Sequence, residues 1–279
     1  MGFMMTYSEV ASNLLQQDVP ALQAFFAEAQ EDFLDQMIEH IGVESPEVRD
    51  YINLRLLIKA QECNALTSEQ QHYLIRTIIE QELLIFKLNT ISSTAVFTRS
   101  LAAEWVRILL KDNVNMLENA VYTTVLVQAV SLLERERDLR SYTEQGLAYS
   151  IVNSSNLIKV LMEHSTFSEK DCPLILGAVS ANFWKNTVFI DNEEEVMIDL
   201  VQKLLTYNLK EELVIEWVEQ IFDKLNTIQA IEGYSELFLH ARTLILNFMK
   251  SFYFVTKFNN GSKKIQAVLS QFINDWHRL

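Results

Sequence analysis

The sequence predicts an all-α protein built from paired antiparallel helices. Two observations lead to this prediction. The 279 residues include only 6 Gly and 3 Pro, which leaves few residues to form hairpins and tight turns. Apolar residues recur at helical spacing along almost the whole chain. Because 49% of the residues are hydrophobic, the chain can bury a large core, and we expect a single all-helical domain over residues 1–279.

About eleven helices are expected, joined by short polar turns that make neighbours antiparallel. In chain order they are predicted over residues 20–42, 45–66, 67–84, 96–113, 117–138, 145–164, 168–185, 191–208, 210–226, 234–258 and 261–279. Two successive helices occupy roughly 40–47 residues, which is the period of HEAT and armadillo arrays. The spacing therefore favours an α/α superhelix, with a compact irregular bundle as the competing architecture.

Several helix starts carry capping residues. Ser45 is expected to cap the second helix, and Thr67 with Gln70 forms the pattern of a capping box at the start of the third. Asp191 with Glu194 has the same pattern before residues 191–208.

The two helices at the middle of the chain are the most apolar. In residues 96–113, the side chains of Phe97, Leu101 and Trp105 lie on one face. Residues 117–138 are apolar on nearly every side until their charged end, so we expect them to form a central helix covered by its neighbours.

The net charge of −14 limits the classes of partner. An acidic surface repels phosphate backbones and anionic membrane surfaces, so we expect neither nucleic-acid nor membrane binding. A protein or peptide partner, favourably a basic one, fits this charge. The cysteines Cys63 and Cys172 are far apart and lack CxxC spacing, as expected of free thiols in a cytoplasmic protein.

Motifs of catalysis and cofactor binding are missing from the sequence. It contains no glycine-rich phosphate loop, no GxSxG, no HExxH and no EF-hand loop. We therefore expect no metal site and no cofactor, and the balance favours a non-catalytic protein over an enzyme.

The stretch Asp138–Leu161 is the most informative part of the chain. It is predicted to form a turn followed by a helix, with Tyr149, Asn153 and Asn156 on one face at i, i+4 and i+7. Polar and aromatic residues stacked at helical spacing in an apolar protein indicate a groove or a buried polar network.

Three short blocks around this stretch carry a family resemblance. They are VFTRS at 96–100, Asp138, Leu139, Arg140 and Tyr142 in DLRSY, and Gly146, Ala148 and Leu157 in GLAYSIVNSSNL. Together they resemble the hallmark blocks of domain-of-unknown-function family 2785, a bacterial family. The resemblance implies an all-helical, HEAT-like fold and covers mainly the middle third of the chain.

The departures from the family pattern bear on function. By resemblance, family members place His, His and Asp where this chain has Tyr149, Asn153 and Asn156, and Trp where it has Leu147. A His-x3-His-x2-Asp row suits metal binding or proton transfer, for which Tyr and Asn are poorly suited. Two interpretations stay open: a lost or altered site, or a buried hydrogen-bond network in which Tyr and Asn exchange donors and acceptors.

Two arginines in these blocks have a similar ambiguity. Arg99 and Arg140 either bind an anion or stitch helices together through carboxylates and helix C-terminal carbonyls. Asp138 and Glu104 are candidate partners. The stitching interpretation is favoured.

Two functions are consistent with these observations. The first is a non-catalytic helical-repeat module that binds a protein or peptide on a concave surface. The second is an enzyme or small-ligand binder with a polar pocket on the Asp138–Leu161 segment. The candidate ligand-binding residues are Arg99, Arg140, Tyr142, Tyr149, Asn153 and Asn156.

Overall fold

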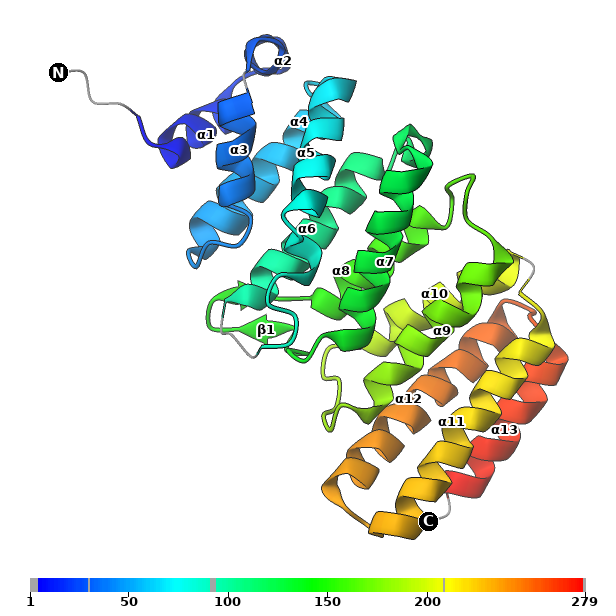
Figure 1. Ribbon diagram of the computed structural model, residues 1–279. Coiled ribbons are helices and arrows are strands. Elements are labelled where there is room, and N and C mark those ends of the chain that lie inside the picture. Colours follow the sequence, from blue (N-terminus) through cyan, green and yellow to red (C-terminus); the bar gives the residue numbers. More distant parts are fainter. Residues whose placement is uncertain (1–4, 30, 91–93, 208, 278–279) are drawn as a thin grey trace. The chain divides into compact units, whose positions relative to one another are not determined.

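The computed structural model describes residues 5–29, 31–90, 94–207 and 209–277. Over these residues the chain forms thirteen α-helices, several short 3₁₀- or π-helical segments and one two-stranded hairpin (Figure 1). The predicted all-α class with antiparallel helix packing is confirmed. The contacts divide the chain into two compact units. Unit 1 comprises the chain up to Leu132 together with Arg140–Ser165. Unit 2 comprises Leu133–Leu139 together with the chain from Thr166 onward.

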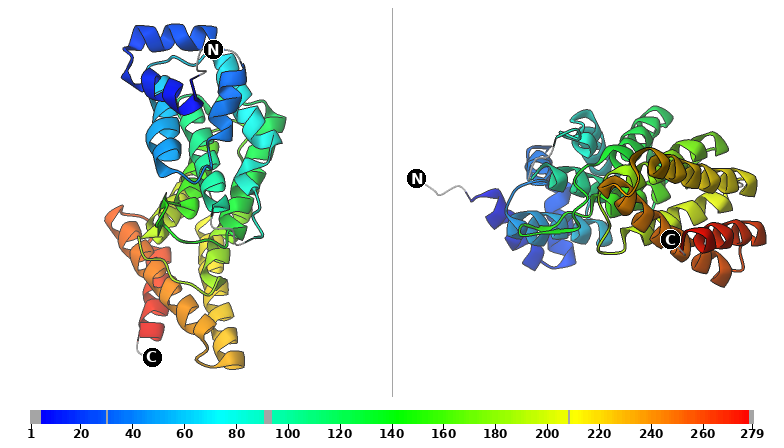
Figure 2. Two further views of the ribbon diagram at one scale, coloured as in Figure 1. Left: turned by 90° about the vertical axis from the view of Figure 1, so that its left-hand side faces the viewer. Right: turned by 90° about the horizontal axis from the view of Figure 1, so that it is seen from below.

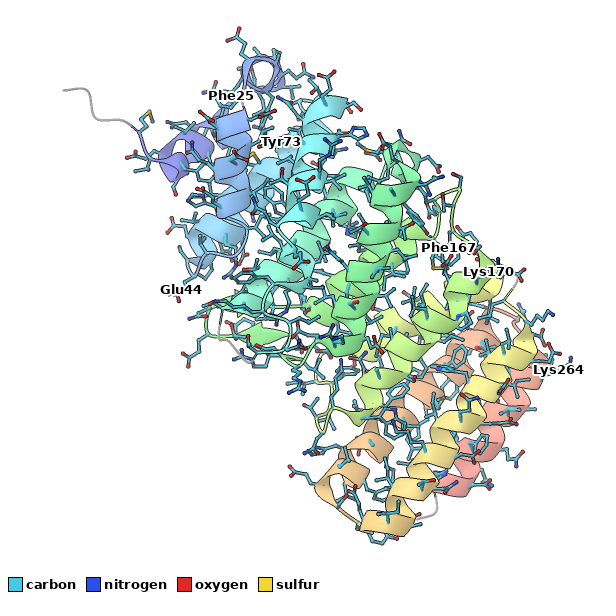
Figure 3. All side chains as sticks on the ribbon, viewed as in Figure 1. Phe25, Glu44, Tyr73, Phe167, Lys170 and Lys264 are labelled. Carbon is cyan, nitrogen blue, oxygen red and sulfur yellow. The ribbon has the colours of Figure 1, made fainter. Side chains whose placement is uncertain are left out.

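Unit 1 holds the N-terminal helices and the hairpin. Its elements are α1 (Tyr7–Gln16), α2 (Val19–Glu28), α3 (Glu31–Glu39), η1 (Glu47–Leu54), α4 (Arg55–Glu62), α5 (Ser68–Glu80), η2 (Leu83–Ile85), α6 (Ala95–Leu110), η3 (Val114–Met116), α7 (Asn119–Arg135, in unit 1 up to Leu132), β1 (Tyr142–Thr143), β2 (Gly146–Leu147) and α8 (Ser150–Leu161). Helix α6 packs against both α5 and α8. Tyr73 on α5 points toward α3 and donates its hydroxyl to Asp35 at 2.6 Å (Figure 3).

Unit 2 consists of the C-terminal helices. Its elements are η4 (Glu169–Asp171), α9 (Cys172–Ala181), η5 (Asn182–Trp184), α10 (Glu193–Thr206), α11 (Glu211–Glu232), α12 (Glu236–Phe258) and α13 (Lys263–His277). The three long helices α11, α12 and α13 lie side by side (Figure 2). Their shared core is aromatic, with Phe222 stacked on Phe272 at a centroid distance of 4.4 Å.

The prediction of a single domain over residues 1–279 stays a prediction. No helix in the part of the chain that the structure describes is both long and apolar enough to cross a bilayer.

The expected number of about eleven helices was too low for two reasons. Residues 20–42 do not form one helix, because Ala29 is extended and separates α2 from α3. Helix α1 was missed although it starts with a capping box, in which Thr6 accepts from Glu9 N and Glu9 accepts from Thr6 N. The pattern T-x-x-E at this point was the available signal.

The predicted central helix is also corrected. In α7, Thr123, Thr124 and Val127 face solvent, and Val127 is 51% exposed. Helix α6 is the covered one, because nearly every residue from Ala95 to Leu110 is buried, including Arg99. The two threonines lie on the exposed side of α7. The high apolar content of the rest of the helix makes this side hard to recognise from the sequence.

The capping predictions had mixed outcomes. Ser45 Oγ accepts from Val48 N at 3.4 Å, and Thr67 forms its capping box with Gln70, as predicted. The capping pair of Asp191 with Glu194 was wrong, because α10 begins after Asn192, whose backbone is left-handed.

Polar side chains bind one helix to the next by donating to main-chain carbonyls, most of which lie near helix ends. In eight of these bonds the two residues lie 40 to 49 positions apart in sequence. In unit 1 these bonds are Gln23 Nε2 to Cys63 O, Lys59 Nζ to Leu15 O, Gln70 Nε2 to Phe26 O, His72 Nε2 with Met116 O, Gln128 Nε2 to Ile79 O and His164 Nε2 with Leu117 O. In unit 2 they are Asn182 Nδ2 to Leu133 O and Trp217 Nε1 to Leu176 O.

These bonds serve a chain with few glycine caps. The last carbonyls of a helix lack intrahelical partners, and an αL glycine is the usual way to satisfy them. Here Asn64, Glu82 and Asn260 hold the αL position after α4, α5 and α12. At several helix ends a side chain of a neighbouring helix adds a further donor, which fixes the position of the neighbour.

Arg99, on the buried helix α6, also donates to main-chain carbonyls of another segment. Its side chain is fully buried, and Nη1 donates to Phe86 O at 2.8 Å and to Lys87 O at 3.4 Å, at the end of η2. These bonds agree with the stitching role that the sequence favoured.

Lys185 is the corresponding cation of unit 2. Its Nζ donates to Asn182 Oδ1 at 2.8 Å and to Leu133 O at 3.3 Å. Burial lowers the pKa of Lys185 to about 8, although the nearby Glu136 and Glu134 oppose this shift.

Replacing Arg99 by Met tests the buried stitch. The variant keeps most of the aliphatic stem but removes the side-chain donor of Phe86 O and one of the donors of Lys87 O, which also accepts from Thr90. We expect a loss of about 2–3 kcal/mol in the free energy of unfolding, measured by urea denaturation. Arg137→Met, at an exposed position, is the control. Equal stability of the two variants would refute the role of Arg99.

The pH dependence of stability tests Lys185. Its pKa is about 8 in the folded chain and near 10.5 when unfolded, so between these values the unfolded chain binds more protons. The free-energy cost of burying the charged Lys185 ammonium is therefore fully present below pH 8. It decreases as the pH rises toward 10.5, so the folded chain becomes more stable.

We expect the free energy of unfolding of the wild type, relative to Lys185→Met, to increase between pH 7 and pH 10. Lys170→Met, at an exposed site labelled in Figure 3, controls for the loss of one charge. A difference that stays constant with pH would contradict the assignment.

Candidate functional site

Unit 1 contains a cleft of about 680 Å³. One wall comes from η1 and α4, and the other comes from α6, the β1–β2 hairpin and the start of α8. The lining residues are Pro46, Asp50, Tyr51, Leu54, Arg55, Ile58, Leu101, Glu104, Tyr142, Glu144, Gly146, Leu147, Tyr149 and Asn153.

The first wall begins with an unusual helix. Residues Glu47–Leu54 form a π-helix that continues into α4, where the sequence predicts one α-helix over 45–66. Arg49 and Asn53 on η1 are fully buried, whereas Tyr51 is 60% exposed. Asn53 accepts from the Tyr7 hydroxyl and donates to Met37 O at 2.9 Å. π-Helical turns are rare and are frequent at functional sites.

The Arg49 guanidinium connects this wall to the other. Its Nε and Nη2 donate to the two carboxylate oxygens of Asp50, at 2.9 and 2.8 Å. Nη1 donates to Val43 O and Glu44 O, and Nη2 also donates to Gln145 O at 2.6 Å in the hairpin turn. A guanidinium has five N–H donors, and here each one has an acceptor.

The ring of Phe97 and the backbone of Gly146 complete the surroundings of Arg49. The guanidinium carbon lies 3.8 Å from the Phe97 ring centre, a cation–π contact removed from water. Gly146 has a φ of +106°, and a Cβ there would lie 3.0 Å from Arg49 Nη2. The hairpin therefore needs glycine at this position both for its backbone and for its approach to Arg49.

The hairpin replaces the predicted start of a helix. The expected helix over 145–164 was wrong in its first turn, because residues 142–147 pair as β1 and β2. Tyr142 pairs with Leu147, so both side chains lie on one face of the hairpin, and both line the cleft. They are 69% and 48% exposed. Local helical spacing does not reveal the bond from Arg49, which comes from a distant segment.

Tyr149 ends the loop and precedes α8. Its φ of +47° and ψ of +32° are left-handed, a conformation that costs a residue other than glycine about 1–3 kcal/mol. The premise that Tyr149, Asn153 and Asn156 share one helical face is therefore corrected, since Tyr149 caps the helix from outside. Such strain is common where a side chain must be aimed at a site.

Asn153 connects α8 to α6. Its Nδ2 donates to Ser100 Oγ at 2.9 Å and to Ser100 O at 3.2 Å. Ala148 and Phe97 belong to one buried cluster nearby. The first and third sequence blocks thus meet in the structure, and Asn153 acts there at least as a tether.

Two of the three carboxylates that line the cleft are paired with an arginine, Asp50 with Arg49 and Glu104 with Arg107. Glu104 binds Arg107 through two bonds of 2.6 and 2.7 Å, and this bonding raises the pKa of Arg107. The Arg55 guanidinium lies 5.3 Å from the Tyr51 ring centre. Glu144, at the hairpin turn, is exposed.

The structure brings together three of the six candidate residues. Tyr142, Tyr149 and Asn153 line the cleft. Arg140 lies beside a separate hollow of about 560 Å³ formed by the hairpin, to which Tyr142 also contributes.

The remaining two candidates lie outside the lining of the cleft. Arg99 is buried against Phe86 and Lys87, and Asn156 is half-buried on α8. The row of Tyr149, Asn153 and Asn156 is therefore divided, with two members at the cleft and one outside it.

The wall formed by η1 and α4 was missed by the sequence interpretation. A usable signal existed, because two polar residues, Arg49 and Asn53, lie on one helical face with a row of apolar residues. The apolar residues of that face are Leu56, Leu57 and Ala60. A polar pair in such a stripe indicates a buried network. The hairpin that this network holds was not visible from the stripe itself.

The described residues contain no group of three or more His, Cys, Asp or Glu arranged to hold a metal ion. Cys63 and Cys172 are both free thiols, and burial raises the pKa of Cys172 to about 11.

Replacing Arg49 by Lys tests the link between the two walls. An ammonium keeps the charge but cannot reproduce the five-donor fork. We expect a loss of about 2 kcal/mol in stability and faster amide exchange in residues 142–147, measured by mass spectrometry. Arg55→Lys on the same wall is the matched control, since its contact is with the Tyr51 ring. Unchanged exchange in the hairpin would show that Arg49 does not hold it.

Comparison with known proteins gives one match. The model of DUF2785, a family of proteins of unknown function, matches residues 84–254, which include α6, the hairpin and α8 but not η1 or α4. No match was found among curated proteins or among solved structures. Because the matched stretch exceeds half of the chain and contains all three sequence blocks, this protein belongs to the DUF2785 family.

Proposed function

We propose that this protein is a non-catalytic module that binds a segment of another protein in the cleft of unit 1. One observation carries the proposal: large apolar side chains are exposed around the cleft. Tyr51, Tyr142 and Leu147 are 60%, 69% and 48% exposed, and all three line it. Large apolar side chains gathered around a hollow mark binding sites, and Tyr is enriched in protein interfaces.

The chemistry of the lining supports binding over catalysis. The lining residues that the structure describes include no Ser, Cys, Lys or His, and their potential acids and bases are three carboxylates and three tyrosines. The carboxylates of Asp50 and Glu104 are each engaged by an arginine. Such residues are suited to hold a ligand in place.

We propose that the helix pairs form HEAT-like repeats of an α/α superhelix. The carbonyl bonds between residues 40 to 49 apart support this, because they recur at about the length of one helix pair. Repeats of this kind present extended surfaces to peptides and proteins.

The proposed partner class follows from charge. The net charge of −14 disfavours nucleic acids and anionic membranes. The two free cysteines support a place in the cytoplasm, where thiols stay reduced.

A small-ligand site at the same cleft is the second candidate. The strained backbone of Tyr149 favours it, because such strain is common at ligand clamps. A thermal-shift screen with metabolites that stabilises the wild type but not Tyr149→Phe would support this candidate over a protein partner.

A displayed library of random 12-residue peptides tests the main proposal. Peptides are selected on the full chain and their affinities are measured by fluorescence anisotropy. We expect micromolar binders that lose at least tenfold in affinity, about 1.4 kcal/mol, to the double variant Tyr142→Ala/Leu147→Ala.

The double variant Ile231→Ala/Tyr234→Ala is the control, because it removes equally exposed apolar side chains in unit 2. Selected peptides should bind it as they bind the wild type. The proposal fails if no peptide is enriched or if the two double variants behave alike.

A further inference from the structure

The cleft presents more carboxylates than cations to a ligand. Asp50, Glu104 and Glu144 line it, against Arg55. Arg49, the partner of Asp50, is buried, and Arg107, the partner of Glu104, is not among the lining residues. The lining therefore offers a ligand three carboxylates and one guanidinium, within a chain of strongly negative net charge.

Two of these carboxylates are fixed in place but not saturated. A carboxylate has about four lone-pair sites, and a bidentate arginine occupies two of them. The side chains of Asp50 and Glu104 are 26% and 19% exposed, so each oxygen pair is held by its arginine and still reaches solvent. Because they are already ordered, these acceptors lose little entropy when a ligand binds.

The free sites suit an ammonium better than a guanidinium. Arginine recognises a carboxylate best through both oxygens at once, and Arg49 and Arg107 already take that approach. A lysine ammonium is a compact charge that donates its hydrogens singly. It can therefore bind oxygens whose bidentate side is occupied.

The rest of the cleft fits a lysine side chain. Leu54, Ile58 and Leu101 offer an apolar surface for its four methylene groups. The Tyr51 ring already attracts one cation, Arg55, and the half-buried Tyr149 adds a second ring to the lining. These aromatic and apolar groups are independent of the carboxylates.

We propose that the protein segment bound in this cleft anchors through a lysine side chain, which the site prefers over arginine. The inference rests on the proposed peptide-binding function and names the chemistry of its partner. The ammonium binds the carboxylates of Asp50 and Glu104 while the stem lies on the apolar lining.

Three synthetic peptide pools test this anchor. Each pool contains 10-residue peptides with random Ala, Leu, Tyr and Ser around one fixed central residue, which is Lys, Arg or the neutral isostere norleucine. We expect the Lys pool to bind the full chain at least tenfold more tightly than the norleucine pool and about fivefold more tightly than the Arg pool. Raising the salt from 50 to 300 mM should weaken binding of the Lys pool more than it weakens binding of the norleucine pool.

Glu104→Gln tests the carboxylate, and Glu216→Gln in unit 2 is its control. We expect the first to reduce the preference for Lys over norleucine and the second to leave it unchanged. Glu104 is partly exposed, and a circular-dichroism melt verifies that each variant is folded.

The outcomes separate this inference from the proposed function. If the norleucine or Arg pool binds as tightly as the Lys pool and the double variant Tyr142→Ala/Leu147→Ala abolishes that binding, the cleft binds peptides but the lysine anchor is wrong. If no pool binds, both proposals fail. If Glu104→Gln keeps the full preference for Lys, the assigned carboxylate is wrong and the inference is overturned.

Discussion

The cleft of this protein depends on one buried cation. The five N–H donors of Arg49 bind the carboxylate of Asp50, two carbonyls before η1 and the carbonyl of Gln145, while the ring of Phe97 covers its face. A guanidinium without water is strongly destabilising unless all its donors are used, so these groups must stay where they are. Residues 96 positions apart are thereby fixed at a single point, and a two-stranded hairpin too short to be stable alone becomes a wall.

The helices are joined by a related rule. Side chains of Gln, Lys, His, Asn and Arg donate to carbonyls near the ends of neighbouring helices, mostly at a separation of one helix pair. In a chain with 6 glycines, Asn64, Glu82 and Asn260 hold αL positions after helices, and these side-chain donors add further bonds at helix ends. Apolar packing alone is non-directional and does not fix how one helix lies against another. Each of these bonds does so, because it joins a side chain of one helix to a main-chain carbonyl of the next.

The cleft combines a family region with a segment outside it. The DUF2785 match begins at residue 84, so α6, the hairpin and α8 lie within it, whereas η1 and α4 come before it. The Phe97 of the VFTRS block covers Arg49, Thr98 leaves no room for a side chain at Gly42, and Ser100 receives Asn153. Hallmark residues of the first block therefore fit together with the N-terminal segment and with α8.

The sequence by itself determined the helical class and most helix positions, because apolar periodicity and capping patterns such as Thr67 with Gln70 act within a few residues. It also singled out the segment that holds Tyr142, Tyr149 and Asn153. It did not show the hairpin, the left-handed Tyr149, the break at Ala29 or the wall with Arg49. Only the tertiary structure decided these, since each depends on contacts between residues far apart in the chain. The bond from Arg49 to Gln145 overrides the local helical preference of residues 145–149, and no pattern confined to one segment contains that bond.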